Sequence, residues 1–280
     1  MHFSSKTIRP PFEARSISLQ VTSGCSHNKC DFCNYYNNIP FNISTYEEII
    51  EDLKELKDKR ISYNRIWLQS ADAFTLKCDR LRTIANLIHE HLPYINSIGC
   101  YSRINSLNNK SVTQLNQLNK LGYDSIVFGT ESGDDYLLKY MNKGYQSRDI
   151  LRQIRKMDKS NMKYTLIFLN GMGGHDYGLT HAIKTASVFN KLNPERIMIN
   201  RLNIHEDTTL YNKVNNNQFK TATPEECIRE LISFIDNLEI DTFIDATNDT
   251  NIIPFFGKTD NKKSIIEKLE HHLEKKTIVS

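Results

Sequence analysis

Short apolar runs alternate with amphipathic stretches from the N-terminal part of the chain to about residue 200. The runs have the length of buried strands, and the stretches between them have the spacing of helices with one apolar face. The pattern predicts six strands, at residues 17–22, 65–68, 95–101, 125–129, 164–169 and 196–200. This succession of strand, helix and strand favours an α/β fold with a parallel sheet.

The amphipathic stretches predict eight helices, and two of their boundaries have a local signal. Ser44 is placed to cap the first helix, with Glu47 returning the bond in a capping box, and Gly122 closes the third. After residue 205 the pattern loosens, and we expect the irregular stretch 241–258 to pack across the sheet or its mouth. The expected helices are 44–56, 79–91, 110–121, 134–141, 148–160, 179–192, 225–238 and 262–275.

Three of the six cysteines, Cys25, Cys30 and Cys33, lie within nine residues directly after the first predicted strand. Loops at the carboxyl ends of parallel strands are where ligands bind, and a loop can curl so that three thiolates converge on one metal centre. A zinc site is one alternative, with His27 as a fourth ligand, but the tight loop would have to be strained. Another alternative is that the three are ordinary core or surface cysteines. Three cysteines without a fourth would leave one iron of a [4Fe-4S] cluster open.

Length and composition bear on the role of the cysteines and on the expected location of the protein. A chain of 280 residues buries enough surface to fold without disulfides, so the cysteines call for chemistry or for core packing. We find no run long enough to span a membrane and no signal sequence, and therefore expect a cytoplasmic protein with reduced thiols. With 36 basic and 33 acidic side chains, the formal net charge of +3 does not indicate nucleic-acid binding, although a local basic groove is not excluded.

Residues 19–33 resemble the cluster loop of the radical S-adenosylmethionine (SAM) superfamily, including the aromatic Phe32 before the last cysteine. The resemblance implies that Cys25, Cys30 and Cys33 ligate a [4Fe-4S] cluster whose open iron chelates SAM. It also implies that reduction cleaves SAM to methionine and a 5′-deoxyadenosyl radical, which takes a hydrogen atom from the substrate. The sequence departs from the usual pattern in having four residues, not three, between the first two cysteines.

A second resemblance lies about 100 residues later. Residues 129–135 and 140–144 are similar to the fourth-strand motif of the branch that contains methylthiotransferases, cobalamin-dependent enzymes and oxygen-independent coproporphyrinogen oxidases. It implies that Glu131 accepts a hydrogen bond from the ribose or amino group of SAM and that Lys143 pairs with its carboxylate. Ordinary charges near helix ends remain the alternative for both residues. The glycine-rich turn that begins at Gly171 falls where the family brings backbone close to adenine.

The resemblance implies an open partial TIM barrel, (β/α)6, with a C-terminal covering segment. We expect one domain, 1–280, with a core at about 14–205 and a helical cover at about 206–280. Further residues expected at the cofactors are Phe32, Tyr35, Gln69 and Ser70; the family's Gly-Gly-Glu is absent from this second strand end. Six candidates at strand ends or in the cover are expected on the substrate side: Asp72, Cys100, Arg103, Arg201, His205 and Asn248.

Several of these residues have ordinary alternatives. Arg103 can belong to a surface ion pair, His205 to a solvated loop and Asn248 to a turn. Cys78, Cys100 and Cys227 are isolated in the sequence, so we expect them in the core, with Cys100 the one that can face the active site.

The function that the resemblance implies is that of an anaerobic radical SAM enzyme. We expect it to act on a small molecule or a peptide, because no cobalamin domain, RNA-binding module or second cluster motif is evident. We also expect it to take electrons from a donor such as flavodoxin or ferredoxin. Radical methyl or methylthio transfer to tRNA is the alternative enzyme function. A non-catalytic iron-sulfur redox sensor is the alternative from another class.

Overall fold

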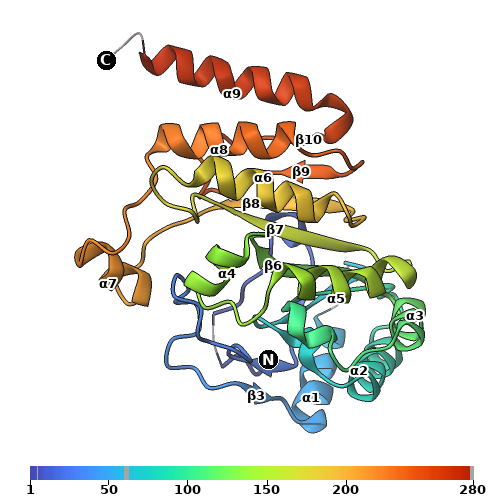
Figure 1. The fold of residues 1–280 in the computed structure, drawn as a ribbon. Coiled ribbons are helices and arrows are strands. Elements are labelled where there is room, and N and C mark those ends of the chain that lie inside the picture. Colours follow the sequence, from blue (N-terminus) through green and yellow to red (C-terminus); the bar gives the residue numbers. More distant parts are fainter. Residues whose placement is uncertain (5, 60–62, 278–280) are drawn as a thin grey trace. The chain divides into compact units, whose positions relative to one another are not determined.

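The main feature of the computed structural model, which describes residues 1–4, 6–59 and 63–277, is an eight-stranded sheet (Figure 1). The strand order is β1-β4-β5-β6-β7-β8-β9-β10. The pairs β1/β4, β4/β5, β5/β6 and β8/β9 are parallel, and β10 is antiparallel to β9. The strands are β1 (Ile17–Gln20), β4 (Arg65–Gln69), β5 (Ser97–Ser102), β6 (Tyr123–Glu131), β7 (Tyr164–Asn170), β8 (Arg196–Arg201), β9 (Phe243–Asp245) and β10 (Phe256–Lys258).

Helices follow most of these strands, as the alternating pattern predicts, which confirms the α/β class. The α-helices are α1 (Tyr46–Asp58), α2 (Cys78–His91), α3 (Val112–Lys120), α4 (Asp135–Tyr140), α5 (Ser147–Lys159), α6 (Gly178–Phe189), α7 (Thr209–Asn215), α8 (Pro224–Asp236) and α9 (Lys262–Thr277). Short 3-10 turns are η1 (Pro11–Glu13), η2 (Ala73–Thr75), η3 (Ile104–Leu107) and η4 (Thr259–Asn261).

Two predictions near the N-terminus need correction. The run 17–22 is not one strand: it is divided between β1 and β2 (Thr22–Ser23), and β2 pairs antiparallel with β3 (Asn42–Ile43) in a separate two-stranded sheet. The first helix is capped one residue later than predicted, by Thr45 with Glu48 in the capping box. Ser44 belongs to the preceding segment, because its N–H donates to the carbonyl of Val21 at 3.1 Å.

The predictions after residue 205 also need correction. We expected residues 241–258 to be irregular and to pack across the sheet, but two segments of this stretch form β9 and β10 and extend the sheet. Each strand has three residues, which is too short for an alternating pattern to show. Helix α7, with Thr208 as its N-cap, was not predicted either.

The chain divides into two compact units. The first comprises residues 1–28, 35–129 and 152–165. In it α1 packs against α2 and α2 against α3. Trp67 is fully buried over Gly99, where a Cβ would lie 2.8 Å from its ring. Arg65 forms a bidentate ion pair with the buried Glu13, with both N···O distances 2.7 Å.

The second unit comprises residues 29–34, 130–151 and 166–280. Its helices α6, α8 and α9 lie side by side (Figure 1), and α8 packs against both of the others. Phe168 stacks on Phe234 with ring centroids 3.9 Å apart, which joins β7 to α8. The expectation of a single domain stays a prediction. No helix in the described ranges is both long enough and apolar enough to cross a membrane.

Candidate functional site

The loop that carries Cys25 is sharply turned, and small polar residues fix its path in the first unit. Gly24 has φ +67°, and a Cβ there would lie 2.6 Å from the carbonyl oxygen of Pro40. Asn28, also at positive φ, donates from its side chain to the carbonyl of Tyr36 at 2.9 Å. Its N–H lies 3.4 Å from the Cys25 sulfur. The backbone geometry thus requires glycine directly before Cys25.

Cys30 and Cys33 lie in the second unit, on a turn in which the Cys33 N–H donates to the Cys30 carbonyl at 3.1 Å. Asp31 anchors this turn. Its N–H donates to the carbonyl of Met141 at 3.1 Å, and its carboxylate pairs with Lys213 at 2.7 Å. The turn is therefore held against the end of α4 and against α7.

The six cysteines fall into two groups by exposure, and none forms a disulfide. Three are buried, as the sequence analysis expects: Cys78, Cys100 and Cys227. Burial raises the pKa of each of these thiols, that of Cys227 to about 11. The other three, Cys25, Cys30 and Cys33, are half-buried. Iron-sulfur clusters are bound by cysteine thiolates, and the assignment of these three cysteines to one cluster stays a prediction.

Asp72, at the end of the segment after β4, is fully buried and holds the cysteine loop. Its carboxylate accepts hydrogen bonds from Ser26 Oγ, from Ser106 Oγ at 2.6 Å and from the Arg103 N–H at 3.0 Å. Burial raises the pKa of Asp72, and these donors act in the opposite direction. The geometry makes Asp72 a support for Ser26, the neighbour of Cys25.

Gln69 and Ser70 are buried and engaged with backbone and side chains of the first unit. Gln69 accepts from the Ile8 N–H at 2.9 Å and donates to Ser18 Oγ at 2.8 Å. Ser70, with φ +98°, donates to the Gly24 carbonyl. The contact with Gly24 places Ser70 at the base of the cysteine loop, whereas Gln69 contacts the N-terminal segment and β1. Their expected contacts with SAM stay predictions.

Three predicted residues lie close together in the second unit. Glu131 ends β6 with φ +65°, and its carboxylate lies 3.6 Å from Lys143 Nζ. Both side chains are largely buried, at 12% and 6% exposed. The Lys143 ammonium lies 5.5 Å from the ring centre of Phe32 and 5.6 Å from that of Tyr145. Burial raises the pKa of Glu131 although Lys143 lowers it, so the carboxylate is held at a cost.

A pocket of about 200 Å³ lies at the ends of β7 and β8 in the second unit. Two predicted residues, Gly171 and Arg201, are in its wall. The Arg201 Nε is buried and has no hydrogen-bond partner among the described residues. Sequence reasoning missed the other lining residues, which carry no motif: Leu202, Asn203, Ile204, Thr221, Ala222 and Cys227.

The remaining candidate residues differ in exposure. Tyr35 is 66% exposed and His205 is exposed. Asn248 accepts from the Thr250 N–H at 3.0 Å, the turn contact that was its ordinary alternative. Cys100 is fully buried in β5 and Arg103 is half-buried. The substrate roles of these residues stay predictions.

Comparisons with known proteins point in one direction. The family model described as the radical SAM superfamily matches residues 19–185, which is more than half of the chain. No curated protein matches.

Solved structures give likenesses of fold. The radical SAM methyltransferase TsrM from Kitasatospora setae is 16% identical with a TM-score of 0.58, covering 72% of this chain and 39% of its own. Methylornithine synthase is 16% identical with a TM-score of 0.55 and coverages of 92% and 81%. Elp3 from Methanocaldococcus infernus is 16% identical with a TM-score of 0.55 and coverages of 94% and 64%. This chain thus spans about two fifths of TsrM, and such likenesses bear on the fold, where they confirm the predicted partial TIM barrel class.

Proposed function

Because the chain belongs to the radical SAM superfamily, we propose that it cleaves SAM reductively and uses the resulting 5′-deoxyadenosyl radical to take a hydrogen atom from a small molecule or a peptide. It is an enzyme, and its cofactors are a [4Fe-4S] cluster and SAM. The observation that carries the proposal is the set of three half-buried cysteines on the loop after β2, inside the segment that the family model matches. When bound, the cluster supplies the electron that cleaves SAM.

In this proposal Cys25, Cys30 and Cys33 ligate the cluster. Gly24 lets the chain turn directly before Cys25, and the Ser26–Asp72 hydrogen bond holds the residue that follows it. These residues position ligands and do not touch the reacting atoms.

Glu131 and Lys143 bind the polar end of SAM in the proposal. The buried ammonium of Lys143 offers donors to a carboxylate, and Glu131 offers an acceptor to a hydroxyl or amino group. Both side chains have lost much of their water already, so a ligand that brings further hydrogen-bonding groups to them is favoured. The wall of the pocket beside Gly171, which has no Cβ, receives adenine.

The direct test is anaerobic reconstitution with iron and sulfide, followed by EPR with and without SAM and by an assay for 5′-deoxyadenosine. We expect a reducible cluster whose spectrum changes with SAM. Replacing any one of Cys25, Cys30 and Cys33 with Ala should abolish 5′-deoxyadenosine formation. Cys78→Ser is the matched control, because that thiol is isolated and buried in α2.

Two outcomes would contradict the proposal. A well-reconstituted wild type without a reducible cluster would remove its basis, and retained turnover in a Cys→Ala variant would refute the ligand assignment. A cluster that responds to oxygen but yields no 5′-deoxyadenosine would instead identify a sensor.

The substrate is sought by adding anaerobic metabolite extracts and measuring 5′-deoxyadenosine above the uncoupled rate. Flavodoxin or ferredoxin serves as the proposed electron donor in this assay. A salt-sensitive gel shift with bulk tRNA would favour methyl or methylthio transfer to RNA instead, because phosphate contacts weaken steeply with salt.

A further inference from the structure

Two glutamates of α8 hold the loop that joins β7 to α6. Glu226 and Glu230 are four residues apart, so they lie on the same face of the helix, one turn from each other. Glu230 is fully buried, and the Glu226 side chain is 24% exposed. Each accepts hydrogen bonds from one end of the loop 170–177, which includes Gly171 of the pocket wall.

Glu230 binds the start of this loop. Its Oε2 accepts from the Gly171 N–H at 2.7 Å and from Asn170 Nδ2 at 3.1 Å, and its Oε1 lies 2.5 Å from His181 Nδ1. A buried carboxylate is tolerated only where donors replace water, and here three donors converge on it. Because the Gly171 N–H is one of these donors, its hydrogen bond to Glu230 restricts the position of Gly171.

His181 is itself fixed in place. It is fully buried and stacks on Phe168 with ring centroids 4.9 Å apart. Its Nε2 is buried without a hydrogen-bond partner among the described residues, and we assign the contact at Nδ1 as a hydrogen bond that the ring donates to Glu230. The ring that contacts Glu230 is thus packed against Phe168, which restricts the position of the carboxylate.

Asn170 connects the two walls of the pocket. Its carbonyl accepts from the Leu202 N–H at 2.8 Å, and its side chain donates to the Cys227 carbonyl at 2.9 Å as well as to Glu230. Gly171 follows with φ +82°, and a Cβ on it would lie 3.1 Å from the Cys227 sulfur. A small displacement of this turn therefore changes the pocket itself.

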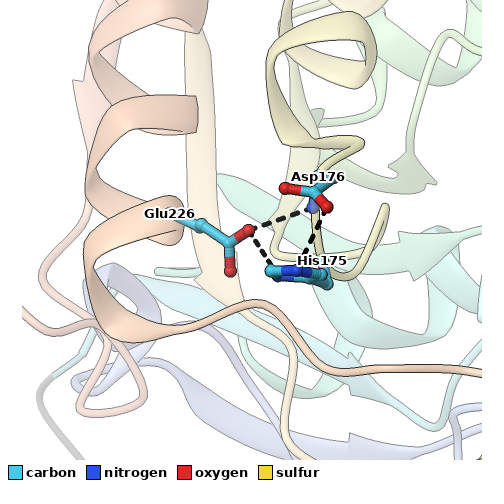
Figure 2. A group of neighbouring side chains, drawn as sticks. All are labelled: His175, Asp176 and Glu226. Atoms are coloured by element: carbon cyan, nitrogen blue, oxygen red, sulfur yellow. Dashed lines mark hydrogen bonds and ion pairs between the residues drawn. The ribbon is translucent and has the colours of Figure 1, made fainter.

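Glu226 holds the far end of the loop, where Figure 2 shows it beside His175 and Asp176. Its Oε1 accepts from the Asp176 N–H at 3.0 Å and lies 2.7 Å from His175 Nδ1, and its Oε2 accepts from the Thr223 N–H at 2.7 Å. The three side chains have the composition of a cation site. However, both oxygens of Glu226 already have donors, and the first turn of α8 presents a positive dipole end. The arrangement fits a loop anchor better than a cation site.

Burial raises the pKa of Glu226, but hydrogen bonds from Thr223, Asp176 and His175 lower it to about 2 overall. The carboxylate is therefore ionised at neutral pH, as an acceptor of several hydrogen bonds should be.

We propose that Glu230 and Asn170 are positioning residues that fix Gly171 in the pocket wall and thereby set the affinity for the adenine end of SAM, while Glu226 anchors the other end of the loop. This inference rests on the proposed function, which assigns the pocket to adenine. It adds residues on α8 and β7 that do not touch the reacting atoms and act through the backbone of Gly171.

The test uses the full chain with its cluster reconstituted, and 5′-deoxyadenosine as the probe in anaerobic calorimetry. Glu230→Gln keeps the shape of the side chain but removes the charge and one acceptor. We expect the dissociation constant for 5′-deoxyadenosine and the KM for SAM to rise about tenfold or more, since hydrogen bonds to a charged group are strong. The kcat at saturating SAM and the EPR spectrum without SAM should stay unchanged. Glu225→Gln, an exposed neighbour on the same helix, is the matched control.

If Glu230→Gln does not fold, Asn170→Ala decides the matter, because Gly171 and His181 still satisfy Glu230 in that variant. Wild-type nucleoside affinity in a folded variant would overturn the inference, as would a lowered kcat with unchanged affinity. A wild type that assembles no cluster and cleaves no SAM would overturn the proposed function instead. For Glu226, a rise in wild-type Tm with Zn²⁺ or Mn²⁺ that is lost in His175→Ala would replace the anchor with a cation site.

Discussion

Replacing Glu131 with Gln separates the effect of this buried carboxylate on stability from its proposed effect on the binding of SAM. At 3.6 Å and an effective dielectric constant near 20, the attraction between Glu131 and Lys143 is about 4–5 kcal/mol. The raised pKa of Glu131 means that the loss of hydration outweighs this attraction. Removing the charge removes both terms, and the amide oxygen of the variant can still face Lys143. We therefore expect the free energy of unfolding to change by no more than about 1 kcal/mol, or a few degrees in Tm, and not to fall.

The dependence on pH follows from the sign of the shift. A carboxyl group whose pKa is raised by folding stabilises the protein below its unfolded value, here 4.5, and this contribution is lost as pH rises through the folded pKa. The amide that replaces this carboxyl group in Glu131→Gln does not titrate. The stability of Glu131→Gln relative to wild type should therefore increase as the pH rises above 4.5, measured by urea unfolding at each pH.

The affinity for SAM should fall in Glu131→Gln, although the stability should not. Loss of a charged acceptor costs about 1.5–3 kcal/mol, so the dissociation constant should rise about tenfold to a hundredfold, measured by anaerobic calorimetry. Glu239→Gln, an exposed position after α8, is the control for loss of a carboxylate as such. A Tm more than a few degrees below wild type, or an unchanged affinity for SAM, would refute the reasoning.

Two further substitutions test the supports of the sheet and of the cysteine loop. Gly24→Ala places a Cβ against backbone at positive φ, so iron bound per chain after reconstitution should fall while the circular dichroism of the fold is kept; full iron content would contradict this. Arg65→Met leaves the buried Glu13 without its bidentate partner and should cost about 3–5 kcal/mol, roughly a 10 °C fall in Tm, whereas Arg82→Met at an exposed pair should change Tm little; equal effects would count against the argument.

The parts of the fold that could be predicted from the sequence are those whose signal is local. The buried strand β7 and the amphipathic α8 each repeat their pattern over seven or more residues. The strands β9 and β10 could not be predicted, because three residues show no period and β9 pairs with β8, which lies far along the chain. The shift of the first cap from Ser44 to Thr45 has the same origin, since the contact of Ser44 with Val21 is not local.

The residues of the candidate site also divide into those that a local sequence motif indicates and those that it does not. The cysteines and Glu131 could be proposed as site residues because each lies in a compact motif, and their roles stay predictions. The structure shows that Glu131, Lys143 and Phe32 lie close together. Glu230 could not be predicted as a functional residue. In the sequence it is one acid on an amphipathic helix, and its partner Gly171 is 59 residues away. Only the fold shows that this acid is buried and points at the pocket wall.

Buried carboxylates play the same part in both units. Asp72 holds Ser26 beside Cys25, and Glu230 holds Gly171 in the pocket wall. An ion kept from water stabilises a protein little, even when well bonded, but it tolerates only the conformation in which every donor is in place. Each acid therefore favours the loop geometry in which its donors are in place. It follows that isosteric substitutions at these two positions should alter cluster assembly and nucleoside affinity more than they alter Tm, which separates positioning from simple packing.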